Sequence, residues 1–196
     1  MNKEIYKGTL CVTAENAMEW RDWLSKQHLT AKNIWLIIHR KNSGKISITY
    51  EEAVEQALCF GWIDSIPNKR DDESYYQFFA KRNPKSNWIK KIKDTIERLL
   101  IHNKVAPAGK TMIEEAKQSG TWTALDDVEN LVVPEDLAEA LKSYKDATEH
   151  FQNFPKSVKR GILEWILNAK RPETRQKRIN ETAEKAAQNI RVNQYR

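Results

Sequence analysis

The chain has 196 residues, of which 40% are hydrophobic and 31% are charged, and it contains seven tryptophans. This apolar content is sufficient for a packed core, which excludes a wholly disordered chain. The net charge of +6 is uneven, because residues 156–196 carry 11 Lys/Arg against 4 Asp/Glu and the rest of the chain is nearly neutral. This basic carboxyl-terminal end is the strongest indication that the composition gives about the partners of the protein.

The sequence lacks the patterns of several large protein classes. Its beginning, MNKEIYKGTL, has no basic-then-apolar signal, and no window approaches 18 consecutive apolar residues. We therefore expect a soluble, cytoplasmic protein without a transmembrane segment. The cysteines Cys11 and Cys59 and the four histidines show no metal-ligand spacing, and there is no glycine-rich phosphate loop. We expect no disulfide framework, no metal site and no cofactor.

The first half of the chain alternates between strand and helix patterns. Apolar residues at period 2 or in short continuous runs indicate strands, and apolar residues at Ala17, Trp20 and Leu24 have helical spacing. The predicted elements are strands at 9–12 and 34–39, a helix at 15–28 and a short alternating segment at 45–49. The strand at 34–39 is apolar on both faces, which is typical of a strand covered on both sides.

A second helix is predicted from Thr49, since Thr49-x-x-Glu52 fits a capping box. Gly61 stands just past its apolar stripe, where a residue in the left-handed conformation ends a helix. WIDSI (62–66) then begins a strand. It is followed by a charged loop and the aromatic segment YYQFFAKR (75–82), which predicts a hairpin.

The pattern beyond this hairpin is helical. Ser86 is placed to cap one helix and Pro107 to begin the next. Between Thr121 and Leu141 there are six acidic residues and no basic one, which indicates a connecting segment. Three apolar stripes at helical spacing follow Pro134.

Together these elements predict an α+β fold, with a small β-sheet and flanking helices in the N-terminal part and an all-helical C-terminal region. The predicted organisation is an α+β domain at 1–120, an acidic connecting segment at 121–133 and a helical, basic domain at 134–196.

The stretch LCFGWIDS (58–65) contains residue types found in active sites. Adjacent strand residues point to opposite faces, so Asp64 is not placed to activate Ser65 as a nucleophile. Cys59 falls on the last helical turn, where the negative end of the dipole disfavours a thiolate, and we expect an unreactive thiol. Two interpretations remain: Asp64 and Ser65 satisfy neighbouring backbone groups, or Trp62 and Asp64 line a ligand pocket.

The segment AKRNPKSNWIKK (80–91) surrounds Trp88 with basic residues, among them Arg82 and Lys85. A basic helix start can bind phosphate or another anion, because its free N–H groups point outward. The alternative is a solvated helix start with Trp88 packed beneath the loop. The candidate ligand-binding residues, expected to converge on one cavity, are Trp62, Asp64, Arg82, Lys85 and Trp88.

A basic surface is predicted on the last helix, where Arg175, Arg178 and Lys185 fall on one side at 100° per residue. The spacing of Glu181 and Lys185 fits a simple solvent-exposed helix. A basic helix face can also meet nucleic acid or an acidic membrane. No RNP motif, zinc finger or helix-turn-helix signature accompanies this helix face. Nucleic acid is therefore a candidate partner that no sequence motif supports.

Five segments occur in an order that resembles a known family. They are TYEEAVEQALCFGWIDS (49–65), KRNPKSNWIKKIK (81–93), PAGKTMIEEAK (107–117), GTW (120–122) and AKRPETRQKRI (169–179). The chain resembles the bacterial YdeI/OmpD-associated family, also called bacteriocin-protection proteins, over nearly its whole length. The resemblance implies a helical C-terminal domain at about residues 134–193 and resistance to cationic antimicrobial peptides or bacteriocins through an outer-membrane porin. It implies no catalytic residue.

We therefore expect a non-enzymatic binding or interaction factor linked to stress or antimicrobial-peptide resistance, with a protein partner or an anionic ligand. Two alternatives are a nucleic-acid or anionic-surface binder acting through the basic C-terminal helices, and an enzyme with a small-molecule pocket outside the known motifs.

Overall fold

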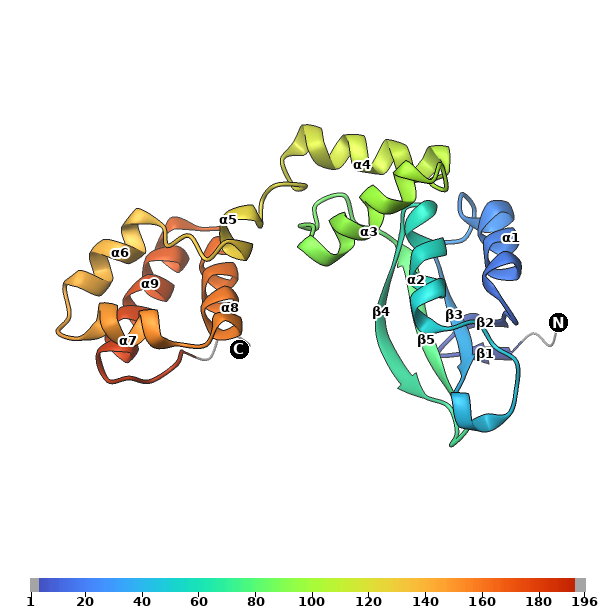
Figure 1. Ribbon diagram of the computed structural model, residues 1–196, viewed down its shortest axis with the longest axis horizontal. Coiled ribbons are helices and arrows are strands. Elements are labelled where there is room, and N and C mark those ends of the chain that lie inside the picture. Colours follow the sequence, from blue (N-terminus) through green and yellow to red (C-terminus); the bar gives the residue numbers. More distant parts are fainter. Residues whose placement is uncertain (1–3, 193–196) are drawn as a thin grey trace. The chain divides into compact units, whose positions relative to one another are not determined.

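The computed structural model describes residues 4–192, and the chain forms two compact units, Met1–Thr123 and Ala124–Arg196. The first unit contains a mixed β-sheet with helices, and the regular elements of the second are helices (Figure 1). The predicted α+β class is confirmed. The limits predicted for the domains stay predictions, and their outermost residues, 1–3 and 193–196, lie outside the described residues.

The sheet of the first unit has five strands among the described residues, in the order β1-β2-β3-β5-β4. β2 and β3 run parallel, whereas β5 pairs antiparallel with both β3 and β4. β1 and β2 form a hairpin whose turn residues, Lys7 and Gly8, both have positive φ, as a type I′ turn requires. The strands are β1 (Glu4–Tyr6), β2 (Thr9–Thr13), β3 (Asn33–His39), β4 (Trp62–Lys69) and β5 (Ser74–Lys81). The sequence did not predict β1, because three residues are too few to show a period.

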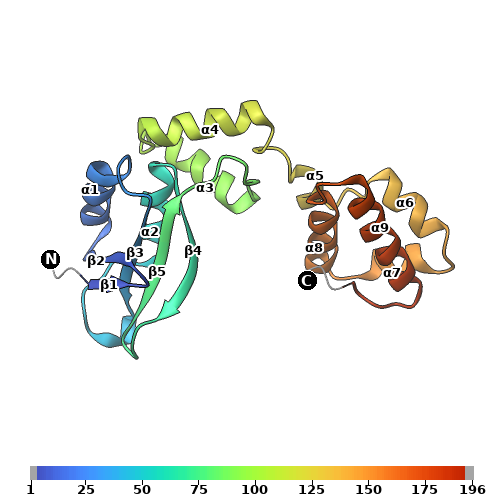
Figure 2. The ribbon, with the colours of Figure 1, turned by 180° about the vertical axis from the view of Figure 1, so that it is seen from behind.

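Helices α1 and α2 lie on one face of the sheet (Figures 1 and 2). Leu24, Leu58 and Leu99 from three helices pack with Leu36 and Phe79 from the sheet in one buried cluster. The helices of the first unit are α1 (Ala17–Gln27), α2 (Tyr50–Cys59), α3 (Lys90–Ile101) and α4 (Pro107–Ser119), with a 3-10 turn at Lys41–Ser43. The alternating segment at 45–49 forms no strand and runs without regular structure into α2.

The opposite face of the sheet carries an aromatic cluster that, among the described residues, comes from strands alone. Tyr6 stacks on Tyr76 with ring centroids 4.1 Å apart and meets Trp35 edge-on at 5.2 Å. Because these rings cover one side of β3 and the helices cover the other, five successive residues of β3 are buried. The predicted two-sided burial of this strand is confirmed.

The start of α2 is fixed by the predicted capping box. The backbone N–H of Glu52 donates to Thr49 Oγ1 at 3.3 Å, and the backbone N–H of Thr49 donates to Glu52 Oε2 at 3.0 Å. Gly61 has φ +74° just after the helix, so glycine's freedom in the left-handed region ends α2 and turns the chain into β4. Both helix boundaries agree with the sequence prediction.

The start of α3 differs from the prediction. We expected Ser86 to cap this helix, but α3 begins at Lys90, its N-cap residue is Ile89, and no side chain caps it. Residues 85–89 are instead nonhelical, and Trp88 is buried there at 2% exposure, tilted against Trp122. Burial of two large aromatic rings outweighs a local cap, since a cap contributes about 1 kcal/mol and a buried tryptophan several times that.

The second unit is built around its own core, which includes Leu137, Phe151, Ile166 and Ile179. Its helices are α5 (Asp126–Glu129), α6 (Glu135–Lys142), α7 (Ala147–Asn153), α8 (Lys156–Leu167) and α9 (Pro172–Ala187). Pro172 occupies the predicted first turn of α9, whereas α7 was not predicted because only Ala147 and Phe151 of its seven residues are buried. The acidic segment contributes Leu125 and Val128 to this core.

Candidate functional site

Two cavities of the first unit share two lining residues, Tyr50 and Asp64. One cavity, of about 600 Å³, extends toward Arg40 and Tyr75. The other, of about 560 Å³, is lined by residues of α2, β4, the segment 82–89 and the first turns of α3, and is called the α2–α3 cavity below. Both volumes lie within the range of sites for small molecules.

Tyr50 and Asp64 form the polar end of the α2–α3 cavity. The Tyr50 hydroxyl donates to Asp64 Oδ2 at 2.7 Å. Burial, and secondly the hydrogen bond to Asp64, raises the pKa of Tyr50 well above its usual value, so this hydroxyl stays protonated at neutral pH. The capping box at Thr49 makes Tyr50 the first residue of α2, where its hydroxyl reaches Asp64 of β4.

Arg82 lies in the same lining and is 8% exposed. One terminal nitrogen donates to the backbone oxygen of Asn87 at 2.6 Å, and the guanidinium lies 3.9 Å from the ring centre of Trp88. Its Nε has no hydrogen-bond partner, and no carboxylate among the described residues forms an ion pair with it. Burial lowers the pKa of Arg82, which remains charged at neutral pH.

The walls between these two ends are aliphatic. Val54 of α2, Ile63 of β4, and Ile89 and Ile92 at the start of α3 line the cavity. Glu55 also lines it, but its carboxylate is paired with Arg98 at 2.5 Å. Arg82 and Asp64 are separated along β4, since the backbone N–H of Arg82 donates to the backbone oxygen of Gly61 and Asp64 lies three residues further along the chain. The cavity therefore combines aliphatic walls with an unpaired buried cation at one end and a carboxylate with a bound hydroxyl at the other.

The structure brings together only part of the predicted ligand-binding set. Asp64 and Arg82 line the α2–α3 cavity. Trp62 is 1% exposed in the core, where its indole N–H donates to the backbone oxygen of His28 at 3.4 Å. Trp88 lies beneath Arg82 and does not line the cavity, and Lys85 is exposed and outside the lining.

Sequence reasoning did not single out Tyr50 and Val54. Their spacing with Ala53, Ala57 and Leu58 predicts that both belong to the apolar stripe of the helix that begins at Thr49, but the buried residues of α2 are Ala53, Ala57, Leu58 and Cys59. Tyr50 and Val54 are one turn apart and face the cavity together. The available signal was a tyrosine next to a helix cap, where a phenol at the edge of a core needs a hydrogen-bond partner.

The three basic residues predicted as a surface of α9 each bond within the second unit. Arg175 holds Asp136 through two hydrogen bonds of 2.7 and 3.0 Å. Arg178 donates to the backbone oxygen of Trp165 and lies 4.8 Å from that ring. Lys185 pairs with Glu181 at 2.8 Å. All three side chains therefore form hydrogen bonds or ion pairs within the second unit.

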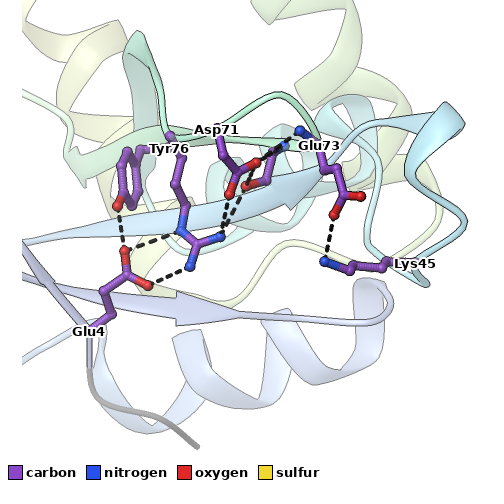
Figure 3. A network of polar contacts seen from close by, with 7 residues as sticks. Glu4, Lys45, Asp71, Glu73 and Tyr76 are labelled. Atoms are coloured by element: carbon purple, nitrogen blue, oxygen red, sulfur yellow. Dashed lines mark hydrogen bonds and ion pairs between the residues drawn. The ribbon is translucent and has the colours of Figure 1, made fainter.

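A second polar cluster lies on the sheet face opposite the helices (Figure 3). Glu4 accepts hydrogen bonds from Arg70, at 2.9 and 3.2 Å, and from the hydroxyl of Tyr76. Arg70 also pairs with Asp71 at 2.9 Å. The bonds from Arg70 and then Tyr76 lower the pKa of Glu4, whereas burial and the bond to Glu4 raise the pKa of Tyr76 to about 12. This network connects β1 with the β4–β5 hairpin.

The two cysteines are buried. Burial raises the pKa of both thiols, Cys11 and Cys59. Within residues 4–192, no group of three or more His, Cys, Asp or Glu side chains is placed to hold a metal ion. In the same part of the chain no helix has the length and apolar character needed to cross a bilayer.

Comparison with known families gives two matches. Residues 12–112, just over half of the chain, match the family described as a domain of unknown function, DUF8412. Residues 130–189 match the family described as bacteriocin-protection, YdeI or OmpD-associated, which confirms the resemblance to this family for the C-terminal part of the chain. The resemblance was drawn over nearly the whole chain, whereas the N-terminal part matches the other family. Neither a search of curated proteins nor a search of solved structures found a match. The α2–α3 cavity lies within the first match and helices α6 to α9 within the second.

Proposed function

This chain belongs to the DUF8412 domain family and carries a bacteriocin-protection domain of the YdeI or OmpD-associated type, and from this premise we propose that it is a non-enzymatic binding protein whose first unit holds a small molecule. The ligand site is the α2–α3 cavity. The observation that carries the proposal is one cavity of about 560 Å³ with aliphatic walls and polar groups at both ends. Small-molecule sites combine apolar walls with a few polar groups that fix orientation in this way.

The polar groups of the cavity support binding better than catalysis. Asp64 accepts a hydrogen bond from Tyr50, whose raised pKa keeps its hydroxyl protonated, so the tyrosine is not a nucleophile and the carboxylate is placed to accept hydrogen bonds from a ligand. Arg82 is held by Asn87 and Trp88, which favours a fixed binding group. Rigid polar groups of this kind recognise a ligand at a small entropic cost.

We propose further that ligand binding serves protection against stress or antimicrobial peptides. The support is the second domain, whose family is named for bacteriocin protection. In this view the second unit contacts the protective machinery, a protein partner, and the first unit senses or carries a small molecule. The protein acts from the cytoplasm.

Filling the cavity tests the proposal. Val54→Trp places a large ring in the lining, while Val133→Trp, a matched change at an exposed valine of the second unit, leaves the cavity intact. We expect the small-molecule fraction of a cell extract to raise the Tm of the wild-type protein and of Val133→Trp, but not that of Val54→Trp. Equal shifts for all three proteins would refute a ligand site in this cavity.

The protective role is tested in cells. Deletion of the gene is expected to increase sensitivity to polymyxin B, a cationic peptide, and expression of the wild-type protein to restore resistance. Val54→Trp is expected to restore little resistance at equal protein abundance. Full restoration by this variant would separate protection from the cavity, and unchanged sensitivity of the deletion strain would refute the protective role itself.

A further inference from the structure

We infer that the ligand of the α2–α3 cavity is a small amphipathic anion, whose carboxylate or phosphate group binds beside Arg82 at the start of α3. The inference rests on the proposed function and names the chemical class of its ligand. It combines three independent features of the cavity: a buried cation that lacks an anionic partner, a helix N-terminus that lacks a cap, and aliphatic walls.

The first feature is the charge of Arg82. A buried cation is strongly disfavoured unless it is paired and hydrogen-bonded. Arg82 is 8% exposed, its Nε has no partner, and its bonds are to the uncharged backbone oxygens of Asn87, at 2.6 Å, and Ser86, at 3.5 Å. Nε is enclosed by the protein, whereas Nη1 makes no hydrogen bond and is not among the buried atoms. An anion at the cavity surface would therefore supply the missing anionic partner through Nη1, because guanidinium groups bind carboxylates and phosphates through charge-assisted hydrogen bonds.

The second feature is the start of α3, which contributes Ile89, Lys91 and Ile92 to the same lining. No side chain caps this twelve-residue helix, and its first turn contains no acidic residue. The helix instead begins with Lys90 and Lys91, whose charge opposes the positive end of the helix dipole. A bound anion would reverse this unfavourable arrangement, since helix N-termini are ready-made anion sites.

The third feature limits the rest of the ligand. The aliphatic side chains Val54, Ile63, Ile89 and Ile92 require an apolar body next to the anionic group. At the far end, Asp64 and Glu51 repel a second anion but accept hydrogen bonds from a hydroxyl or amine. The cavity therefore fits a ligand with one anionic end, in contrast to a nucleotide or polyphosphate.

Calorimetric titration of the full chain with octanoate and octanol tests the anionic end. The two probes share a chain length and differ in charge. We expect octanoate to bind the wild-type protein at least about tenfold more tightly than octanol, which is the contribution of one charge-assisted hydrogen bond. Arg82→Gln should abolish this preference and leave octanol binding unchanged. Lys85→Gln removes a charge from the same segment outside the lining and should preserve it.

A second variant keeps the test decisive if Arg82→Gln does not fold. Ile89→Glu places a carboxylate in the lining at the helix N-cap, where an acid is favourable, so it should fold, pair with Arg82 and exclude octanoate. Equal affinities for the two probes would overturn the inference and leave the proposed function standing. A preference that survives both variants would also overturn it. If neither probe binds, the inference is wrong, and the extract experiment decides separately on the proposed function.

Discussion

At the scale of single residues, Glu4 connects β1 with the β4–β5 hairpin on the sheet face opposite the helices. It accepts two hydrogen bonds from Arg70 and one from Tyr76 (Figure 3). These bonds hold its pKa below the ordinary value of 4.5. A carboxyl with a depressed folded-state pKa contributes stability above its unfolded pKa, and this contribution is lost as the pH falls through the folded pKa.

We therefore predict that Glu4→Gln lowers the free energy of unfolding by about 1 kcal/mol at pH 7, because both partners are about one-third exposed and solvent screens the pair. The loss should shrink as the pH falls from 4.5 through the lower folded-state pKa, because the carboxyl is then protonated first in the unfolded and finally also in the folded wild-type protein. The pKa of Tyr76 should fall below about 12 while burial, the larger cause, still keeps it raised, and absorbance titration of tyrosinate measures this change. Glu73→Gln is the control, since Glu73 pairs with Lys45 between half-exposed side chains. Equal effects of the two changes would contradict the prediction.

Residue types in the candidate site could be predicted from the sequence, but their partners could not. Basic residues beside a tryptophan indicated an anion site, and Arg82 does line a cavity with Asp64. The burial of Trp62 and Trp88 beneath that cavity depends on contacts with His28 and Trp122, which lie more than 30 residues away in sequence. Local spacing carries no information about such long-range contacts.

At the scale of elements, the close packing of α4 against the end of α2 is set by Gly109. A Cβ at this position would lie 2.4 Å from the backbone oxygen of Cys59 and 2.9 Å from Val105 Cγ1. The same backbone oxygen accepts a hydrogen bond from Ala106 at 2.9 Å. The end of α2 therefore cannot shift to relieve a clash with a new Cβ at Gly109 without losing this hydrogen bond.

This contact predicts that Gly109→Ala destabilises the first unit. In a free helix the change stabilises by about 1 kcal/mol. Here the clash involves backbone atoms, so we expect a net loss of about 1–3 kcal/mol in urea unfolding. Lys110→Ala, on the exposed neighbour, should change stability by less than about 0.5 kcal/mol. A stabilising effect of Gly109→Ala would show that α4 and α2 are not in close contact.

The two helix starts of the first unit show what local sequence determines. The capping box at Thr49 was predicted and is present, because all its atoms lie within four residues. The cap at Ser86 was predicted and is wrong, because Trp88 packs against Trp122 and keeps the preceding residues out of the helix. Local signals are reliable where no buried side chain competes with them.

At the scale of the whole molecule, the division into a sheet-containing part and a helical part followed from hydrophobic periodicity, which extends over many residues. The sheet order β1-β2-β3-β5-β4 did not, since it depends on pairings such as Trp35 with Phe78 across more than 40 residues. The acidic composition of residues 121–133 suggested a connection, yet Leu125 and Val128 of that segment belong to the core of the second unit. Leu125 and Val128 have helical i, i+3 spacing, but the segment is too short for this spacing to be distinguished from that of the other apolar residues around them.

The two main hydrophobic cores share no residue, which predicts separate responses to mutation. Leu99 and Leu137 are both fully buried, one in each core. Leu99→Ala should destabilise the first unit by about 2–5 kcal/mol, and Leu137→Ala the second unit by a similar amount. Hydrogen exchange on the full chain localises each effect: Leu137→Ala should speed exchange in α6 and α9 and leave β3 and α2 unchanged, with the reverse for Leu99→Ala. Faster exchange in both units from either change would mean that the chain unfolds as one cooperative structure, and ligand binding in the first unit would then also stabilise the second.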